Sequence, residues 1–315
     1  MSEPPVPPDR SDGPVPGAHD DDRRGGDAGL FGPDSVTWRV HAEPLMGVAG
    51  LRALLLQALH PVAVAAFIEH STYRQDWWGR LSRTAEYIAV TTFGSTTDAM
   101  LAASRVRAIH ARVHGTLQNG VTYDAEDPQL LGWVHCCLVA SFLEVVTRGG
   151  LGLTGAEQDA YVAEQVRAAM LVGLEPHEVP HDRAALLDYF RVIKPALECS
   201  PVARRAAMDL VAPPMPARIA FTTPARPAWA GIAGLAFAAL PPWGRRLYAL
   251  PELPGAAGLT DAATTVGLRS LRTALRGAQA VIPPLREGPH LRAARARLHV
   301  VPEHPADMGD PSAEP

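Results

Sequence analysis

The stretch DPQLLGWVHCCLVASFLEVVTRGG, residues 127–150, has the pattern of one long apolar helix with both ends marked. Asp127 can cap its first turn, and Pro128 suits the first helical position, where no backbone N–H is needed. Gly149 and Gly150 mark its end. A helix that is apolar on most sides is covered by its neighbours. The stretch therefore predicts a helix in the interior of the protein.

Helical patterns continue on both sides of this stretch. Ser95 or Thr96 can cap one of them, and Thr154 with Glu157 has the spacing of a capping box. Neither an internal repeat nor the alternation of a β-strand is visible in the sequence. The expected helices cover residues near 34–42, 50–60 and beyond, 74–94, 95–115, 127–150, 153–173, 183–197, 228–240 and 261–277, and an Arg-rich stretch follows near 285–299. The sequence therefore predicts an all-α fold, a single orthogonal bundle of many helices.

Composition sets the expected domain boundaries. Residues 1–33 are rich in Pro, Gly and Asp and lack the apolar segment of a signal peptide, so we expect a disordered tail. Residues 34–302 form the helical domain, and residues 303–315 form a second disordered tail. The apolar runs 53–68 and 228–244 are short for membrane spans and contain Pro, so they predict core helices. Peripheral contact with a membrane stays open.

Charge and cysteine content exclude several classes of protein. The chain has 315 residues, 47% of them hydrophobic, and a formal net charge of −4 at pH 7, which argues against a nucleic-acid partner. Cys136, Cys137 and Cys199 form no CxxC pair, which excludes a zinc ribbon or an iron–sulfur site. We expect reduced thiols and a cytoplasmic protein.

Histidines in helical patterns are the first candidates for chemistry. Arg107, His110 and His114 share one helical face at positions i, i+3 and i+7. His135 lies in the apolar helix, where its buried ring nitrogens would need partners, and iron is one such partner. On spacing alone, a histidine in such a place is more often a hydrogen-bonded core or boundary residue.

Two arginines and a threonine form a second candidate group. Arg80, Arg83 and Thr84 stand at i, i+3 and i+4, so their side chains would converge on one side of a helix. A solvated basic face is one interpretation. The alternative is that the arginines face inward, where they would need a partner such as a carboxylate or a haem propionate.

One metal-binding motif is set aside. Residues 177–181, HEVPH, match the zinc-protease pattern H-E-x-x-H in letters. Both histidines reach one zinc ion only from a regular helix, and Pro180 inside the motif, with Pro176 before it, breaks a helix. We therefore predict no zinc site in this segment.

Five pieces of the chain, taken in order, resemble a known family. They are LQALHPVAVAAFIEHS (56–71), GRLSRTAEYIAVTTFG (79–94), VRAIHARVHG (106–115), YDAEDPQLLGWVHCCLVASFLEVV (123–146) and LTGAEQDAYVAEQVRAAMLVGLEPHEVP (153–180). Their order is similar to that in the oxygenase family of the latex-clearing rubber oxygenases and the fungal MpaB oxygenase, over about residues 36–250. The resemblance implies an all-α bundle that encloses a pocket for one b-type haem.

The resemblance also implies an iron ligand. In the rubber-cleaving members, this ligand is a histidine three residues after an arginine, which corresponds to His110 after Arg107. His114 would lie beside His110 as a second cofactor contact. His135 is the rival ligand, because its helix is the more apolar.

The distal side of the haem corresponds to Arg80, Arg83 and Thr84. The rubber-cleaving pattern has lysine at the position of Arg83, and arginine in effect cannot lose a proton to bind iron. Arg83 would instead donate hydrogen bonds to dioxygen or to a haem propionate.

The function expected from this resemblance is that of a haem b-dependent oxygenase. Its partners would be dioxygen and a small apolar substrate, such as an isoprenoid or another hydrocarbon, with an electron donor left unspecified. The alternatives are a non-catalytic haem protein, such as a gas sensor or haem carrier, and a haem-free helical module. Consumption of substrate separates the first from the second.

Overall fold

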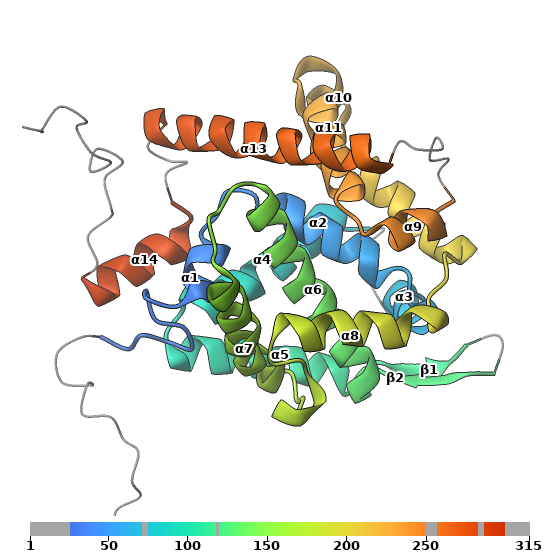
Figure 1. Cartoon of the computed structure of the whole chain (residues 1–315). Coiled ribbons are helices and arrows are strands. Elements are labelled where there is room, and N and C mark those ends of the chain that lie inside the picture. Colours follow the sequence, from blue (N-terminus) through green and yellow to red (C-terminus); the bar gives the residue numbers. More distant parts are fainter. Residues whose placement is uncertain (1–25, 71–74, 118–119, 250–256, 283–286, 300–315) are drawn as a thin grey trace, which may run out of the picture.

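The computed structural model describes residues 26–70, 75–117, 120–249, 257–282 and 287–299 (Figure 1). These residues fold into helices with one small sheet, which confirms the predicted all-α class. Residues 1–25 of the tail expected at 1–33, and the whole of the tail expected at 303–315, lie outside them. The elements are α1 (Val36–His41), α2 (Met46–Gln57), α3 (Pro61–His70), α4 (Trp77–Phe93), α5 (Thr96–His110), β1 (His114–Thr116), β2 (Thr122–Asp124), α6 (Pro128–Arg148), α7 (Gly155–Leu171), η1 (Pro176–Glu178), α8 (Arg183–Ile193), η2 (Lys194–Ala196), α9 (Pro201–Val211), α10 (Ala217–Thr222), α11 (Ala225–Ala238), α12 (Pro242–Leu247), α13 (Ala257–Val281) and α14 (Pro289–Leu298).

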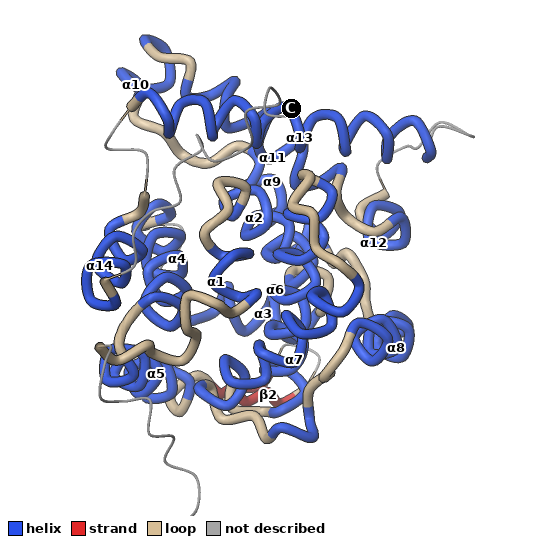
Figure 2. The backbone as a smooth tube through the Cα atoms, turned by 60° about the vertical axis from the view of Figure 1, so that its left-hand side comes forward, coloured by secondary structure: helices blue, strands red, loops and turns tan. Residues whose placement is uncertain are grey.

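Helix α6 lies in the centre of the bundle, as its sequence predicts (Figure 2). The Asp127 carboxylate accepts a hydrogen bond from the Gln129 N–H at 2.8 Å and caps the first turn. Helix α2 packs along α6, and the indole N–H of Trp133 donates to the Gln57 carbonyl at 3.1 Å. Trp133 is fully buried, and each such large apolar side chain contributes about 1.5–3 kcal/mol to folding.

Helix α6 is also long enough and apolar enough to cross a membrane, by length and composition alone. Of its most apolar window, 72% is buried inside the protein, as in the core helix of a soluble protein. Helices α2 and α3 would pass the same test only as one broken span, bent by 107°. One or two such helices are weak evidence for a membrane span.

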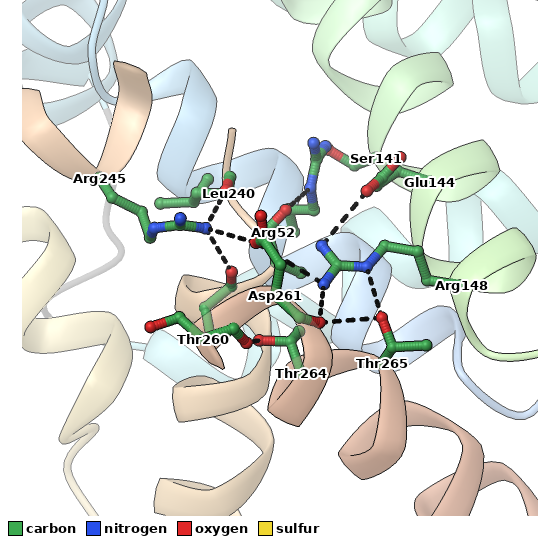
Figure 3. A network of polar contacts seen from close by, with 12 residues as sticks. Arg52, Ser141, Glu144, Arg148, Leu240, Arg245, Thr260, Asp261, Thr264 and Thr265 are labelled. Atoms are coloured by element: carbon green, nitrogen blue, oxygen red, sulfur yellow. Dashed lines mark hydrogen bonds and ion pairs between the residues drawn. The ribbon is translucent and has the colours of Figure 1, made fainter. Parts of the chain in front are cut away.

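Buried arginines fasten the later helices to this core (Figure 3). Arg52 of α2 donates through Nε to the Ala239 carbonyl at 2.8 Å. Arg245 of α12 donates to the Leu240 carbonyl at 2.8 Å and pairs with Asp261 of α13 at 3.3 Å. Cations beside the last carbonyls of a helix are favoured by the helix dipole. The two arginines therefore stabilise the end of α11 and hold α11–α13 against α2.

The segment before α1 packs on the bundle, so the body begins earlier than residue 34. Phe31 is 1% exposed. Asp27 accepts hydrogen bonds from the Thr96 backbone N–H at 2.6 Å and from its hydroxyl at 2.8 Å. Arg297 of α14 donates to the Asp27 carbonyl at 2.7 Å. Residues 26–33, which the composition assigned to the tail, thus connect α5 with α14.

The helix expected over 95–115 is shorter than predicted. It begins in a capping box between Ser95 and Asp98, but it ends at His110. His114 opens a two-stranded antiparallel hairpin and pairs with Asp124, so the expectation of no strand was also wrong. Gly115 pairs with Tyr123 across this hairpin.

Candidate functional site

The end of α5 and the start of α4 bring two of the predicted site residues together. The guanidinium of Arg80 on α4 lies over the ring of Phe67 from α3, 5.4 Å from the ring centre. Arg80 is close enough to His110 for its positive charge to lower the pKa of that imidazole. Three helices, α3, α4 and α5, therefore contribute to one site.

His110 is the last residue of α5 and is half-buried. Its Nδ1 atom is shielded from solvent and has no hydrogen-bond partner in the described part of the chain. Burial lowers the pKa of His110, and Arg80 lowers it further, while Glu126 opposes both. The arrangement favours a neutral imidazole with an unpaired ring nitrogen, the form in which histidine binds a metal.

Arg83 does not join this site. Its guanidinium donates to the Asp76 carboxylate at 2.9 Å, and the two side chains are 57% and 53% exposed. Asp76 is the N-cap of α4, where its side chain also accepts from the Gly79 N–H at 3.1 Å. The hydrogen bond from Arg83 lowers the pKa of Asp76. Arg83 stands about two helical turns after Asp76, so its long side chain can reach back to this surface acid.

The Thr84 hydroxyl is used within its own helix. It donates to the Arg80 carbonyl at 3.1 Å, one turn back along α4. The three residues of the predicted distal group thus separate: Arg80 lies over Phe67, the Thr84 hydroxyl bonds to the backbone, and Arg83 pairs with Asp76 at the surface.

The remaining predicted residues are spread apart. Arg107 is exposed on α5, and His114 is exposed on the hairpin. The prediction that His114 shares a helical face with His110 is wrong, because the helix ends at His110. His135 lies in α6, 8% exposed, and burial lowers its pKa to about 4. No hydrogen bond to the His135 ring occurs among the described residues.

Tyr87 was missed by the sequence reasoning. It follows Arg80 and Thr84 on one side of α4 at i+7 and i+3, and Thr91 continues the row. The Tyr87 hydroxyl is buried without a hydrogen-bond partner in the described part of the chain, and burial raises the pKa of Tyr87 to about 12. Its spacing from Arg80 was the available signal, but a tyrosine at that position is also typical of a core residue.

His41 shows how a core histidine differs from His110. Its Nδ1 lies 2.7 Å from the Thr92 hydroxyl and its Nε2 lies 3.1 Å from the Tyr161 hydroxyl. Burial lowers the pKa of His41 to about 3. Both ring nitrogens of His41 have hydrogen-bond partners, so His41 is a core residue. Nδ1 of His110 has no such partner among the described residues.

A second group missed by the sequence lies where α3 ends. The Tyr123 hydroxyl donates to the Glu69 carboxylate at 2.8 Å and lies 2.7 Å from Nε2 of His70. Burial raises the pKa of Tyr123 to about 12, and its bond to Glu69 adds to the effect. These contacts attach the hairpin to α3, the helix that carries Phe67.

The HEVPH segment does not form a regular α-helix, as its prolines predict. Residues Pro176–Glu178 form one turn of 3-10 helix, and the His181 ring bonds to the Pro176 carbonyl at 2.9 Å. Nor does any group of three or more His, Cys, Asp or Glu side chains able to hold a metal ion occur among the described residues.

Comparison with known families settles the class of the chain. Residues 38–277 match the family described as "ER-bound oxygenase mpaB/B'/Rubber oxygenase, catalytic domain". The chain belongs to this family. The printed description of the family is that of an oxygenase catalytic domain, which agrees with the resemblance seen in the sequence.

Two curated relatives carry no assigned function. They are the uncharacterized proteins Mb2261 of Mycobacterium bovis and Rv2237 of Mycobacterium tuberculosis. Each is 30% identical to the chain over 112 residues, which is 36% of this chain and 44% of the relative. The chain thus spans less than half the length of the relatives it matches. No solved structure matches the chain.

Proposed function

We propose that this family member is a haem b-dependent oxygenase that uses dioxygen to oxidise an apolar substrate, such as an isoprenoid or another hydrocarbon. The observation that carries the proposal is the buried, unpaired ring nitrogen of His110. A single neutral imidazole can bind a haem iron, whereas a site for a bare metal ion needs several ligands. The unpaired imidazole of His110 therefore supports haem as the cofactor, rather than a bare metal ion.

The chain's own residues would divide the work as follows. His110 would bind the iron, and Arg80, whose charge is felt at His110, would supply a positive charge for a carboxylate of the haem. The cofactor supplies the activation of dioxygen when it is bound. Phe67 packs under Arg80 and keeps that guanidinium in place. Arg83 takes no part, because it is held by Asp76 at the surface.

An absorption spectrum of the purified full-length chain, recorded with one equivalent of haem, tests the cofactor. We expect a Soret band, a shift on reduction and a further shift with carbon monoxide. Consumption of dioxygen together with an alkene then separates an oxygenase from a gas sensor or haem carrier.

The ligand is tested by three histidine variants. His110→Ala should abolish or shift the Soret band, while His114→Ala, on the exposed hairpin, is the matched control and should keep it. If His135→Ala loses the band and His110→Ala keeps it, the assignment of the ligand is wrong. A wild-type protein that binds no haem would contradict the proposed function itself.

A further inference from the structure

The side of α4 that carries Arg80 also carries a buried hydroxyl that finds no partner in the described part of the chain. Tyr87 stands seven residues after Arg80 and three after Thr84, so the three side chains lie along one side of the helix. The Tyr87 oxygen is shielded from solvent. Helix α4 packs against α5. The last residue of α5 is His110, which is half-buried, and its Nδ1 atom also lacks a hydrogen-bond partner in the described part of the chain.

A buried hydroxyl without a hydrogen bond is unfavourable, because it has lost water and gained no partner. Three other buried tyrosines in the described part of the chain have hydrogen-bond partners. The Tyr248 hydroxyl donates to the Leu55 carbonyl at 2.6 Å, Tyr123 donates to Glu69, and Tyr161 bonds to His41. Local violations of this kind are expected where a ligand completes the hydrogen bonds.

We propose that the Tyr87 hydroxyl is a cofactor-binding group that donates a hydrogen bond to a carboxylate of the haem, with Arg80 as the cationic partner of the haem carboxylates. The inference rests on the proposed function, and it adds a binding residue that the family resemblance does not supply.

The chemistry of Arg80 and Tyr87 on α4 favours a carboxylate as the group that accepts the hydrogen bond from Tyr87. A tyrosine with a raised pKa stays protonated and is a donor at neutral pH. Arg80 places a permanent positive charge on the same side of the helix. The propionates are the groups of haem b that combine negative charge with acceptor oxygens, so a donor and a cation together suit them.

The binding test compares two probes. Haemin and its dimethyl ester, in which both propionates are uncharged, are titrated into wild-type protein and into Tyr87→Phe, and the affinity is read from the Soret band. We expect Tyr87→Phe to weaken haemin binding by about tenfold or more, as for loss of a hydrogen bond to a charged group. The ester should bind both proteins with similar affinity. Equal affinity of both proteins for haemin would overturn the inference, and so would an equal loss with the ester.

The stability test needs no cofactor. In the haem-free protein, Tyr87→Phe removes an unsatisfied hydroxyl, so we expect Tm to rise by about 2–4 °C. Tyr248→Phe is the matched control: the same substitution removes a satisfied hydrogen bond and should lower Tm. A fall in Tm for Tyr87→Phe would mean that its hydroxyl is already bonded in the haem-free fold, which would overturn the inference.

The outcomes separate the two proposals. If wild-type protein binds no haemin, the proposed function fails and the role of Tyr87 fails with it. If wild-type protein binds haemin through His110 and Tyr87→Phe binds it equally well, the inference about Tyr87 fails alone.

Discussion

Acid should destabilise the haem-free protein through two buried histidines. Burial lowers the pKa of His41 from 6.5 to about 3 and that of His135 from 6.5 to about 4. Above pH 6.5 each ring is neutral in both the folded and the unfolded chain, so the stability is complete there. As the pH falls from 6.5 towards 4, the unfolded chain takes up protons that the folded chain refuses, and stability is lost.

The size of the effect follows from the same pKa values. At pH 5 about 97% of an unfolded histidine is protonated, whereas both folded rings remain largely neutral. Linkage then gives a loss of about 2 kcal/mol for each histidine between pH 8 and pH 5, and about 4 kcal/mol for both. That is a large part of the 5–15 kcal/mol by which a typical domain is stable.

Urea unfolding of the haem-free protein at a series of pH values measures this loss. His135→Gln and His41→Gln should each remove about 2 kcal/mol of the loss between pH 8 and pH 5, and the double variant about 4 kcal/mol. Each variant is compared with wild-type protein at the same pH, so that the carboxylates common to both cancel. A single variant that keeps the full wild-type slope would refute the reasoning for that histidine.

Four further substitutions test the site and its surroundings. Arg80→Ala should weaken haemin binding about tenfold or more in a Soret titration, while Arg83→Ala, which loses only the exposed pair with Asp76, should leave it unchanged. Glu43→Gln should lower the free energy of unfolding by about 2–4 kcal/mol in urea, because this 2% exposed carboxylate pairs with two arginines of α13. Gly115→Ala should cost about 1–3 kcal/mol in the same assay, since its Cβ would lie 2.5 Å from the Tyr123 hydroxyl. Glu43→Gln or Gly115→Ala at wild-type stability would contradict the packing argument for that residue.

Local signals in the sequence predicted the helices well where the chain itself provides the capping groups. Asp127 and the paired Thr154 and Glu157 cap α6 and α7 with side chains only two or three residues away, so their bonds could be read from spacing. The apolar surface of α6 predicted its place in the core for the same reason. Both signals depend on neighbours along the chain and not on distant contacts.

The end of α5 could not be predicted in that way. The helical pattern runs through His114, but the chain turns into a hairpin in which Ala125 donates to the Val113 carbonyl at 2.8 Å. The partner strand comes after the turn, and its Tyr123 is held by Glu69 on α3. Contacts made outside the helix therefore override its local propensity, and they remove His114 from the face of His110.

Long polar side chains caused the other error of prediction. Helical spacing correctly places Arg80 and Arg83 near each other, but the guanidinium of Arg83 reaches Asp76, seven residues before it. Helical spacing gives the position at which a side chain leaves the backbone. The contacts of a long side chain decide where its charged group lies. Arg80 stands only four residues after the same acid, yet its guanidinium lies over Phe67 and its charge lowers the pKa of His110.

Hydrogen bonding distinguishes His110 from the core histidine His41 more sharply than burial does. His41 and His110 both have a pKa lowered by burial, and both stand at the end of a short or medium helix. The ring of His41 has a hydroxyl on each side, so folding alone accounts for it. His110 and Tyr87 each retain a buried polar atom that the described fold does not satisfy. Folding would favour an apolar residue at both positions. Their presence on two packed helices of an oxygenase family member is explained if a bound group supplies the missing partners.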